Sequence, residues 1–431
     1  MNPGARLAAA IEVLGDIDAR HRPVAEALKD WGKSHRFAGV GDRSAIGNFV
    51  YDALRRRRST AFVMHAETPR AIVLGTVGRE IGATPLAAMI ADAPHAPDPL
   101  SAEEAARIDG ADLSAAPDAI RADVPDWIAD KLRRAFGDTW IAEAEALAGR
   151  PALDIRVNRL KADRERVARD LAQAEFVPTP FSPDGLRVPP TSGNRRHPNV
   201  SAEPAYLKGL FEIQDEGSQL AARLVGAEPG QQVLDLCAGG GGKTLALAAA
   251  MDNRGQLHAT DADKHRLAPI FDRLKRAGTR NVQVHPARTD LAPLEGTMDR
   301  VLIDAPCTGT GTWRRRPDIK WRLTEKALAD RIGEQAALLR QGAAFVRSGG
   351  RLVYVTCSLL PDENTDKIAA FLAEHPDFTA LPATAAIAAA GLGEDAAQRL
   401  GAAVLATAEG LFMTPLRTAT DGFFVAVLQR A

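Results

Sequence analysis

The sequence predicts an α/β protein in which a parallel sheet follows a helical N-terminal region. Three observations support this prediction. From residue 211 onward, short apolar runs alternate with helical stretches, a pattern typical of a parallel sheet with helices on both faces. One of these runs leads directly into a glycine-rich turn. Over residues 1–145, apolar side chains recur at helical spacing instead.

Length, composition and charge are those of an ordinary globular protein. The 431 residues suffice for two or three domains, and 45% hydrophobic with 25% charged residues is an ordinary globular mix. Because no apolar run reaches the roughly 18–20 residues of a membrane span and no secretory pattern opens the chain, we expect a cytoplasmic protein. We also expect a monomer without a bound metal. The net charge of −1 predicts no polyanion partner, but a local basic surface would still suffice for one.

Three domains are expected along the chain. Residues 1–145 should form a helical domain, residues 146–210 a small α+β module that ends in a polar loop at 191–199, and residues 211–431 the strand–helix domain. The expected strands of this last domain cover residues 233–236, 256–263, 281–285, 300–306, 351–358 and 421–429.

The segment VLDLCAGGGGKT places a glycine-rich turn between a buried strand and a helix that begins near Thr244. Glycines let the backbone approach a ligand, and a helix N-terminus offers free N–H groups, so a nucleotide-like cofactor is expected here. A P-loop is one alternative, although Cys237 occupies the position of its first glycine. Asp261 ends the next run, where an acid binds ribose hydroxyls, which favours S-adenosylmethionine or NAD. Asp290 could reach the adenine end or cap a helix.

Cys237, Cys307 and Cys357 are too few and too widely spaced for a disulfide framework or a structural zinc site. Cys307 and Cys357 each follow an apolar strand, and sheets of this kind bind ligands beyond the carboxyl ends of their strands. If the two strands are neighbours, both thiols share the cofactor cleft. The alternative is that each cysteine is a small buried apolar residue.

A thiol beside a methyl donor suits methylation at C5 of cytosine or uracil. A thiolate that adds to C6 makes C5 nucleophilic, and the thiol leaves after methyl transfer and loss of the C5 proton. Asp304, which precedes Cys307, is the nearest acid for N3 or N4 of cytosine.

The block from Phe211 to the C-terminus closely resembles the Sun-type RNA (cytosine-5) methyltransferases. The matching pieces are FEIQDEGSQL, DLCAGGGGKT, ATDADKHRL, DAPCTGTG, RRRPDIKW, LVYVTCSLLPDEN and TDGFF. The resemblance implies a Rossmann-like methyltransferase sheet, S-adenosylmethionine as cofactor and RNA, in particular ribosomal RNA, as partner. PALDIRVNRLK is similar to the family's small RNA-binding module, and GDRSAIGNFVYDALRRRRS is similar to part of the NusB-like domain of its bacterial 16S rRNA members.

The resemblance also implies roles for single residues. Cys357 matches the nucleophile and Cys307 the thiol that assists product release, and Asp304 is expected to orient the base. The expected cofactor contacts are Cys237, Ala238, Gly239, Gly240, Gly241, Gly242, Lys243, Asp261, Asp290 and Asp304. Gly239 and Gly240 replace the alanine and proline usual in the family, which we expect to loosen the loop and weaken cofactor affinity.

The target cytosine must be unpaired or flipped out of its helix. The expected phosphate contacts are Arg314, Arg315, Arg316 and Lys320 after the Cys307 loop, with Arg195 and Arg196 in the linker. Trp313 and Trp321 could stack on bases or pack under the loop. The run at 55–58 is a weaker candidate, because a charge run usually marks a solvated helix end. A P-loop ATPase and a non-catalytic RNA-binding assembly factor are the rival functions.

Overall fold

The computed structural model describes residues 1–91, 93–193 and 195–431, which form two compact units. The first unit consists of Met1–Arg150, Thr191–Arg196 and Thr312–Leu323, and the second consists of Pro151–Pro190, His197–Gly311 and Thr324–Ala431. The segment that follows the Cys307 loop therefore belongs to the first unit and interrupts the expected domain at 211–431. Asn194, within the expected polar loop, lies outside the described residues.

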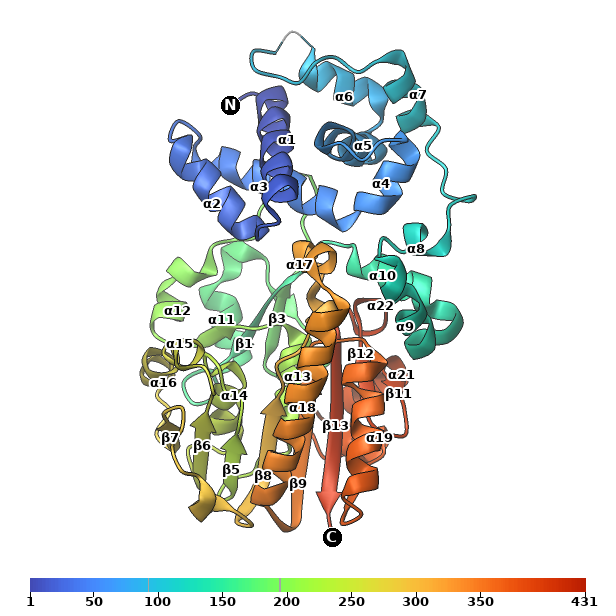
Figure 1. The fold of residues 1–431 in the computed structure, drawn as a ribbon. Coiled ribbons are helices and arrows are strands. Elements are labelled where there is room, and N and C mark those ends of the chain that lie inside the picture. The colour runs from blue at the N-terminus through green and yellow to red at the C-terminus, as the bar shows by residue number, and fades with distance from the viewer. Residues whose placement is uncertain (92, 194) are drawn as a thin grey trace. The chain divides into compact units, whose positions relative to one another are not determined.

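The first unit is helical, as the sequence predicts (Figure 1). Its helices are α1 (Pro3–Arg20), α2 (Val24–Ser34), α3 (Val40–Arg55), α4 (Arg57–Met64), α5 (Pro69–Ile81), α6 (Ala83–Ile90), α7 (Ala102–Asp109), α8 (Asp118–Arg121), α9 (Asp126–Phe136), α10 (Trp140–Leu147) and α17 (Pro317–Arg322). Local signals explain several of their starts. Asn2 caps α1 by accepting the N–H of Ala5, and Ser101 with Glu104 forms a capping box on α7.

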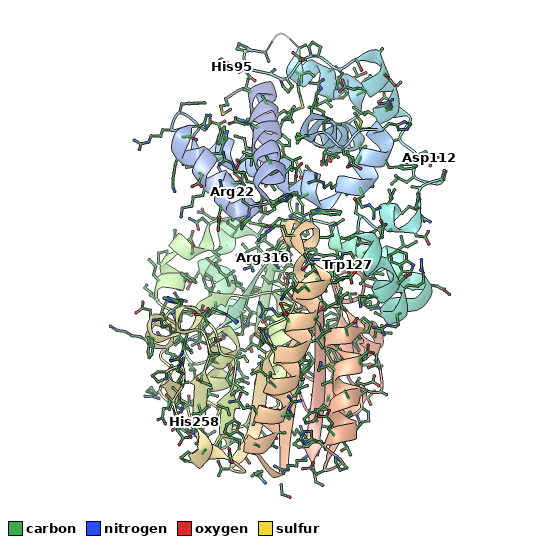
Figure 2. The ribbon with its side chains drawn as sticks, in the orientation of Figure 1. Arg22, His95, Asp112, Trp127, His258 and Arg316 are labelled. Carbon is green, nitrogen blue, oxygen red and sulfur yellow. The ribbon has the colours of Figure 1, made fainter. Side chains whose placement is uncertain are left out.

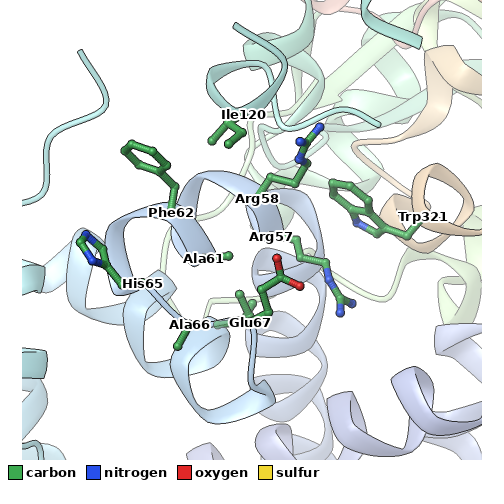
Figure 3. A pocket seen from close by; sticks show the side chains of 10 residues that line it. Arg57, Arg58, Ala61, Phe62, His65, Ala66, Glu67, Ile120 and Trp321 are labelled. Atoms are coloured by element: carbon green, nitrogen blue, oxygen red, sulfur yellow. The ribbon is translucent and has the colours of Figure 1, made fainter. Parts of the chain in front are cut away.

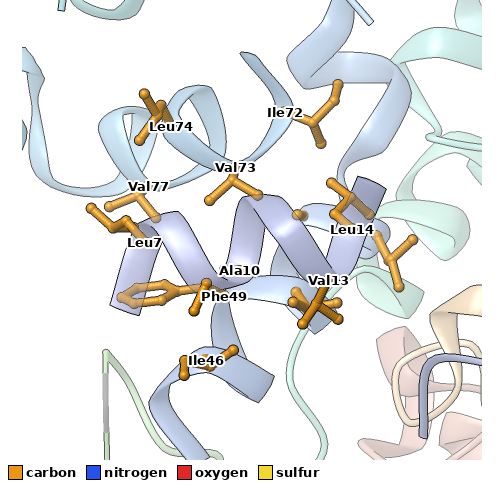
Figure 4. Packing of buried hydrophobic residues seen from close by; sticks show 14 of the residues in the cluster. Leu7, Ala10, Val13, Leu14, Ile46, Phe49, Ile72, Val73, Leu74 and Val77 are labelled. Atoms are coloured by element: carbon orange, nitrogen blue, oxygen red, sulfur yellow. The ribbon is translucent and has the colours of Figure 1, made fainter. Parts of the chain in front are cut away.

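One apolar core holds these helices together. Leu7 and Leu14 of α1, Ile46 of α3, and Ile72 and Leu74 of α5 are at most 1% exposed and belong to one cluster (Figure 4). Burial of each such side chain stabilises the fold by about 1.5–3 kcal/mol. The helical spacing read from the sequence thus corresponds to the buried faces of α1 and α3.

Helix α17 donates hydrogen bonds to the last carbonyls of α3. Lys320 Nζ donates to the carbonyl of Arg55 at 3.1 Å, and Trp321 Nε1 donates to that of Leu54 at 2.7 Å. The Arg55 guanidinium donates in return to the carbonyl of Arg314 at 2.6 and 2.9 Å. Because the last turn of a helix leaves its carbonyls without helical partners, these donors fix the inserted segment to the helical unit.

The second unit begins with a small antiparallel sheet. Its strands are β1 (Leu153–Val157), β2 (Val177–Pro178), β3 (Gly185–Val188) and β4 (Phe211–Ile213), in the order β2-β3-β1-β4, with α11 (Arg164–Asp170) and α12 (Pro204–Leu207). Strand β4 pairs with β1, since Val157 lies opposite Phe211 and Ile155 opposite Ile213. The expected boundary at residue 211 therefore cuts this sheet, because a three-residue apolar run does not specify its partner strand.

The large sheet contains the strands that the sequence predicts for residues 211–431. Its strands are β5 (Gln232–Asp235), β6 (Gln256–Thr260), β7 (Val282–His285), β8 (Met298–Asp304), β9 (Val346–Thr356), β10 (Phe378–Ala380), β11 (Leu405–Ala406), β12 (Leu411–Met413) and β13 (Phe423–Arg430). The order is β11-β12-β13-β9-β8-β5-β6-β7, with β10 on β13. Strands β9, β8, β5, β6 and β7 run parallel, and β13 runs antiparallel to β9.

Helices cover both faces of this sheet, as expected. They are α13 (Glu216–Leu224), α14 (Gly242–Ala250), α15 (Lys264–Leu267), α16 (Ile270–Ala277), α18 (Glu325–Phe345), α19 (Thr365–Glu374), α20 (Ala383–Ala388), α21 (Glu394–Ala403) and α22 (Pro415–Thr418). On one face Leu302 of β8 shares a core with Leu220 of α13 and Leu247 of α14. On the other face α18 lies so close to β8 that a Cβ on Gly342 would be 2.7 Å from Ile303 Cδ1.

No helix in the described ranges is both long and apolar enough to cross a membrane.

Candidate active site

The carboxyl ends of four parallel strands bring most of the predicted site residues to one edge of the large sheet. Asp235 ends β5, Asp304 ends β8, and Asp261 and Cys357 come directly after β6 and β9. Strand β8 lies between β5 and β9, and Asp304 is in register with Val355 near the end of β9. This is the edge at which open α/β sheets bind their ligands.

The two strand-end thiols are in contact. Cys307 Sγ lies 3.4 Å from Cys357 Sγ, and both side chains are partly exposed. The sequence predicts that the two thiols share a cleft if their strands are neighbours. The strands are neighbours, because β8 pairs with β9. A second link joins the two loops, since the N–H of Gly311 donates to the carbonyl of Cys357 at 2.9 Å.

The surroundings of the three cysteines differ in what they do to the thiols. The hydrogen bond with Cys357, together with burial, raises the pKa of the Cys307 thiol well above its usual value. Cys307 therefore keeps its proton at neutral pH and is able to donate its S–H to Cys357. Burial also raises the pKa of the Cys237 thiol, and a protonated thiol is a poor nucleophile. Cys357 lies in contact with the protonated Cys307 thiol, at a distance of 3.4 Å between the two sulfurs.

An ion pair stands at the same edge. Lys243 Nζ lies 2.6 Å from Asp304 Oδ2, and the lysine side chain is buried while the aspartate is about a third exposed. The ammonium also lies 5.4 Å from the centre of the Phe423 ring. Lys243, the residue on which a P-loop would depend, is thus turned toward an acidic side chain.

The backbone of the glycine loop adopts a conformation that suits glycine. Gly241 has φ +83°, and a Cβ there would lie 2.6 Å from Ile270 Cγ1. Gly239 has φ +49°, and its N–H donates to Asp261 Oδ2 at 2.9 Å. The N–H of Ala238 donates to the carbonyl of Thr260 at 2.9 Å. The loop is therefore attached to the end of β6 at two consecutive residues.

Two arginines hold carbonyls of the glycine loop. Arg273 donates to the carbonyl of Gly240 at 2.6 Å and to Glu212 Oε2 at 2.9 Å, and Arg156 donates to the carbonyl of Gly242 at 2.9 Å. The expectation that Gly239 and Gly240 loosen the loop stays a prediction. These arginines lie 33 and 86 residues from the carbonyls that they bind, so the local sequence gives no sign of them.

The polar groups at this edge fit S-adenosylmethionine. Asp261 accepts the N–H groups of Gly239 and Asp263 at 2.9 and 2.8 Å, and each carboxylate oxygen keeps a lone pair for a ribose hydroxyl. Asp235 is fully buried and accepts the Thr244 hydroxyl on Oδ2 at 2.7 Å, while its Oδ1 has no partner within the described residues. Burial raises the pKa of Asp235 to about 7.

Asp290 is the predicted cofactor contact with the least structural support. It is exposed in the loop after β7, and its Oδ1 accepts the N–H of Ala292 at 3.0 Å. This bond corresponds to the capping role that the sequence left open as an alternative. No described contact joins Asp290 to Asp261 or to the glycine loop.

Two of the expected phosphate contacts, and one of the two tryptophans expected to stack on bases or pack under the loop, are buried. Arg314 is 4% exposed, Lys320 3% and Trp313 1%. Lys320 Nζ lies 4.7 Å from the centre of the Trp321 ring and 5.6 Å from that of Trp313, and burial lowers the pKa of this lysine to about 8. Arg314 and Lys320 therefore fasten the inserted segment to the helical unit. Arg316, which is labelled in Figure 2, belongs with Arg195 and Arg196 to the exposed residues.

A pocket of about 600 Å³ in the helical unit is lined by residues that are far apart in the sequence (Figure 3). Arg57, Arg58 and Phe62 of α4 line it together with His65 and Trp321. Arg57 pairs with Asp18 and Arg58 with Asp126, at 2.6 and 2.7 Å. Part of the arginine run at 55–58 thus shares a cavity with an aromatic side chain of the inserted segment.

The fold and this edge of the sheet define an S-adenosylmethionine-dependent methyltransferase.

A family model described as 16S rRNA methyltransferase RsmB/F matches residues 222–429. A second, described as an RsmF/B-like ferredoxin-like domain, matches residues 124–191. The chain is 32% identical to the probable ribosomal RNA small subunit methyltransferase B of Synechocystis sp., over 71% of this chain and 67% of the relative. It is 35% identical to the ribosomal RNA small subunit methyltransferase B of Sodalis glossinidius, over 72% and 67%.

The ribosomal RNA small subunit methyltransferase B of Klebsiella pneumoniae is 36% identical, over 59% of this chain. The chain spans between 58% and 67% of the length of these three curated relatives. Among solved structures, PH0851 is similar over 100% of this chain and 99% of its own, with 25% identity and a TM-score of 0.71. A methyltransferase homolog protein from Pyrococcus horikoshii is similar over 73% and 98%, with 27% identity and a TM-score of 0.56.

The chain therefore belongs to the 16S rRNA methyltransferase RsmB/F family. Membership in this family favours a methyltransferase over the P-loop ATPase alternative.

Sequence reasoning missed one acidic residue close to the thiols. Glu363 is fully buried and binds the residues that follow both Cys307 and Cys357. Its local signal is its place in LLPDEN, six residues after Cys357 and within the family-like segment LVYVTCSLLPDEN.

Proposed function

We propose that this chain transfers a methyl group from S-adenosylmethionine to C5 of a cytosine in ribosomal RNA, in the cytoplasm. The observation that carries the proposal is the contact of Cys307 and Cys357 at 3.4 Å beside Asp304, on the sheet edge that also bears the glycine loop. The printed names of the relatives point to the RNA of the small ribosomal subunit.

In this proposal Cys357 Sγ bonds to C6 of the cytosine and the ring's electron pair becomes available at C5. Asp304, ion-paired with Lys243, would orient the base by accepting a hydrogen bond from its N4 amino group. S-adenosylmethionine, when bound, supplies the methyl group that C5 receives. The glycine loop and Asp261 would hold it.

Product release requires that the C5 proton leave and that the bond between Cys357 Sγ and C6 break. Cys307 retains its proton and lies in contact with the departing sulfur. It would therefore donate a hydrogen bond from its S–H to the Cys357 sulfur as that bond breaks, which stabilises the departing thiolate. Cys237, whose raised pKa keeps it protonated, has no covalent part in the reaction.

The helical unit offers groups for the RNA. Arg195, Arg196 and Arg316 are exposed and suit phosphates. The pocket that contains Arg57 and Trp321 combines a cation with an aromatic ring, a combination suited to an unpaired nucleotide. The division into a helical RNA-binding domain, a small RNA-binding module and a methyltransferase domain is part of this proposal.

Methyl transfer to RNA tests the proposal directly. Tritiated S-adenosylmethionine should label small-subunit RNA from a strain that lacks the gene, and bisulfite sequencing should locate one or a few cytosines that depend on the protein. Cys357→Ala should abolish labelling while calorimetry still detects cofactor binding. Binding of ribosomal RNA without any methyl transfer would instead support the non-catalytic assembly factor.

A further inference from the structure

A single buried carboxylate links the two cysteine loops. Glu363, in the turn after β9, is fully buried. Its Oε1 accepts the N–H of Thr308 at 2.9 Å, and its Oε2 accepts the hydroxyls of Thr308 and Ser358. Thr308 directly follows Cys307, and Ser358 directly follows Cys357.

Other contacts hold Glu363 and both loops in place. Gln335 Nε2, on α18, donates to Glu363 Oε1 at 2.9 Å and to the carbonyl of Pro306 at 3.0 Å. The Tyr354 hydroxyl donates to the carbonyl of Glu363 at 2.8 Å. The carboxylate thus has donors from the β8 loop, the β9 loop and α18, and no lysine or arginine pairs with it in the described part of the chain.

The choice of a carboxylate here has a chemical reason. An ionised carboxylate only accepts hydrogen bonds and has about four lone-pair sites, so it can bind two N–H and two O–H donors at once. A glutamine would present an amide NH2 group to two of these four donors. Hydrogen bonds to a charged group are stronger than neutral ones, and the loss of a buried acceptor leaves its donors without partners.

We propose that Glu363 is a positioning residue that sets the distance between the Cys307 and Cys357 sulfurs by holding the residue after each cysteine on one carboxylate. The expected effect on methyl transfer rests on the proposed function, whereas the effect on the distance between the two sulfurs does not. Because a displacement of about 1 Å from a reactive geometry costs on the order of 100-fold in rate, a loose pair of loops should slow the covalent steps. Binding of cofactor and RNA should change little.

The experiment compares Glu363→Gln with Glu374→Gln, a matched change at an exposed glutamate of α19. The direct readout is oxidation by diamide, an azo compound. Two thiols form one S–S bond, and their two hydrogens reduce the N=N bond to a hydrazine, so the Cys307–Cys357 peptides lose 2 Da in a mass spectrometer. We expect cross-linking at least about fivefold slower in Glu363→Gln than in wild type, and unchanged in Glu374→Gln.

Methyl transfer gives the second readout. We expect kcat of Glu363→Gln to fall about 10- to 100-fold, with KM for RNA and Kd for S-adenosylmethionine within about twofold of wild type. If wild type transfers no methyl group, the proposed function fails, and the cross-linking rate still decides the role of Glu363. Wild-type cross-linking and wild-type kcat in Glu363→Gln would overturn the inference.

Ser358→Ala provides a second variant should Glu363→Gln not fold. It removes one hydroxyl donor to Glu363 and leaves the carboxylate in place. Slower cross-linking with unchanged cofactor affinity supports the positioning role. A cross-linking rate equal to that of wild type contradicts it.

Discussion

Asp235 should make the protein less stable as the pH rises from 4 to 7. This carboxyl ends β5 directly before the glycine loop, is fully buried, and leaves Oδ1 without a partner within the described residues. Burial raises its pKa from 3.8 to about 7. Between these two values the unfolded carboxyl has lost its proton while the folded one still holds it, so ionisation favours the unfolded state.

The expected size follows from that shift. About three pKa units correspond to a cost of about 4 kcal/mol, absent below pH 3.8, growing through the interval and complete above pH 7. Asp235→Asn cannot ionise and should escape this cost, but its buried NH2 group replaces the partnerless oxygen and costs about 1–3 kcal/mol. The variant should therefore be less stable than wild type near pH 4 and more stable by about 1–3 kcal/mol at pH 8.

Urea unfolding at several pH values measures this difference. Hydrogen exchange of peptides from β5 and α14 reports on the second unit alone, which matters because two units need not unfold as one. Asp252→Asn, at an exposed aspartate, is the matched control. A stability difference between Asp235→Asn and wild type that stays constant from pH 4.5 to pH 8 would refute the reasoning. The stabilised variant should also bind S-adenosylmethionine more weakly, since a buried acceptor at the cofactor edge is lost.

Four further outcomes are expected. Cys307→Ala should accumulate a protein–RNA adduct that survives denaturing gels; normal turnover without a trapped species contradicts its role in release. Burial lowers the pKa of Lys320 to about 8, so its charged form should cost the folded state about 3 kcal/mol below pH 8, and this cost should disappear as the pH rises toward 10.5. Calorimetric unfolding should therefore show stability rising between pH 8 and pH 10.5 in wild type and not in Lys320→Met. Equal pH profiles of the two proteins would contradict this expectation. Arg273→Met should weaken S-adenosylmethionine binding about 10-fold in calorimetry, because it frees the carbonyl of Gly240; an unchanged Kd would show that the arginine does not support the loop. Replacing Arg195, Arg196 and Arg316 together by alanine should lower the slope of log K against log salt for RNA binding by about 2–3, with Lys326→Ala as the control; an unchanged slope removes them from the interface.

The local chemistry of this chain could be predicted from its sequence. Alternating strands and helices, the glycine turn before α14 and the position of each cysteine after an apolar strand all depend on residues close together in the chain. Strand order could not be predicted in this way. The adjacency of β8 and β9, which brings two sulfurs 50 residues apart to 3.4 Å, arises from pairing between distant segments.

The basic residues after Cys307 show the limit most clearly. Their composition predicted a solvated RNA surface, yet Arg314 and Lys320 are buried against the end of α3. An arginine or lysine in a short segment has the same local pattern whether it binds phosphate or caps a distant helix, because only the tertiary partner decides between the two.

The sequence by itself thus determined the kinds of chemical group present and the strand ends that carry them, since periodicity and turn residues act over a few positions. The tertiary structure alone decided which groups meet. The thiol pair, the arginines on the glycine loop and the carboxylate of Glu363 between two loops all require contacts between residues that the chain keeps apart, and local propensities do not encode such contacts.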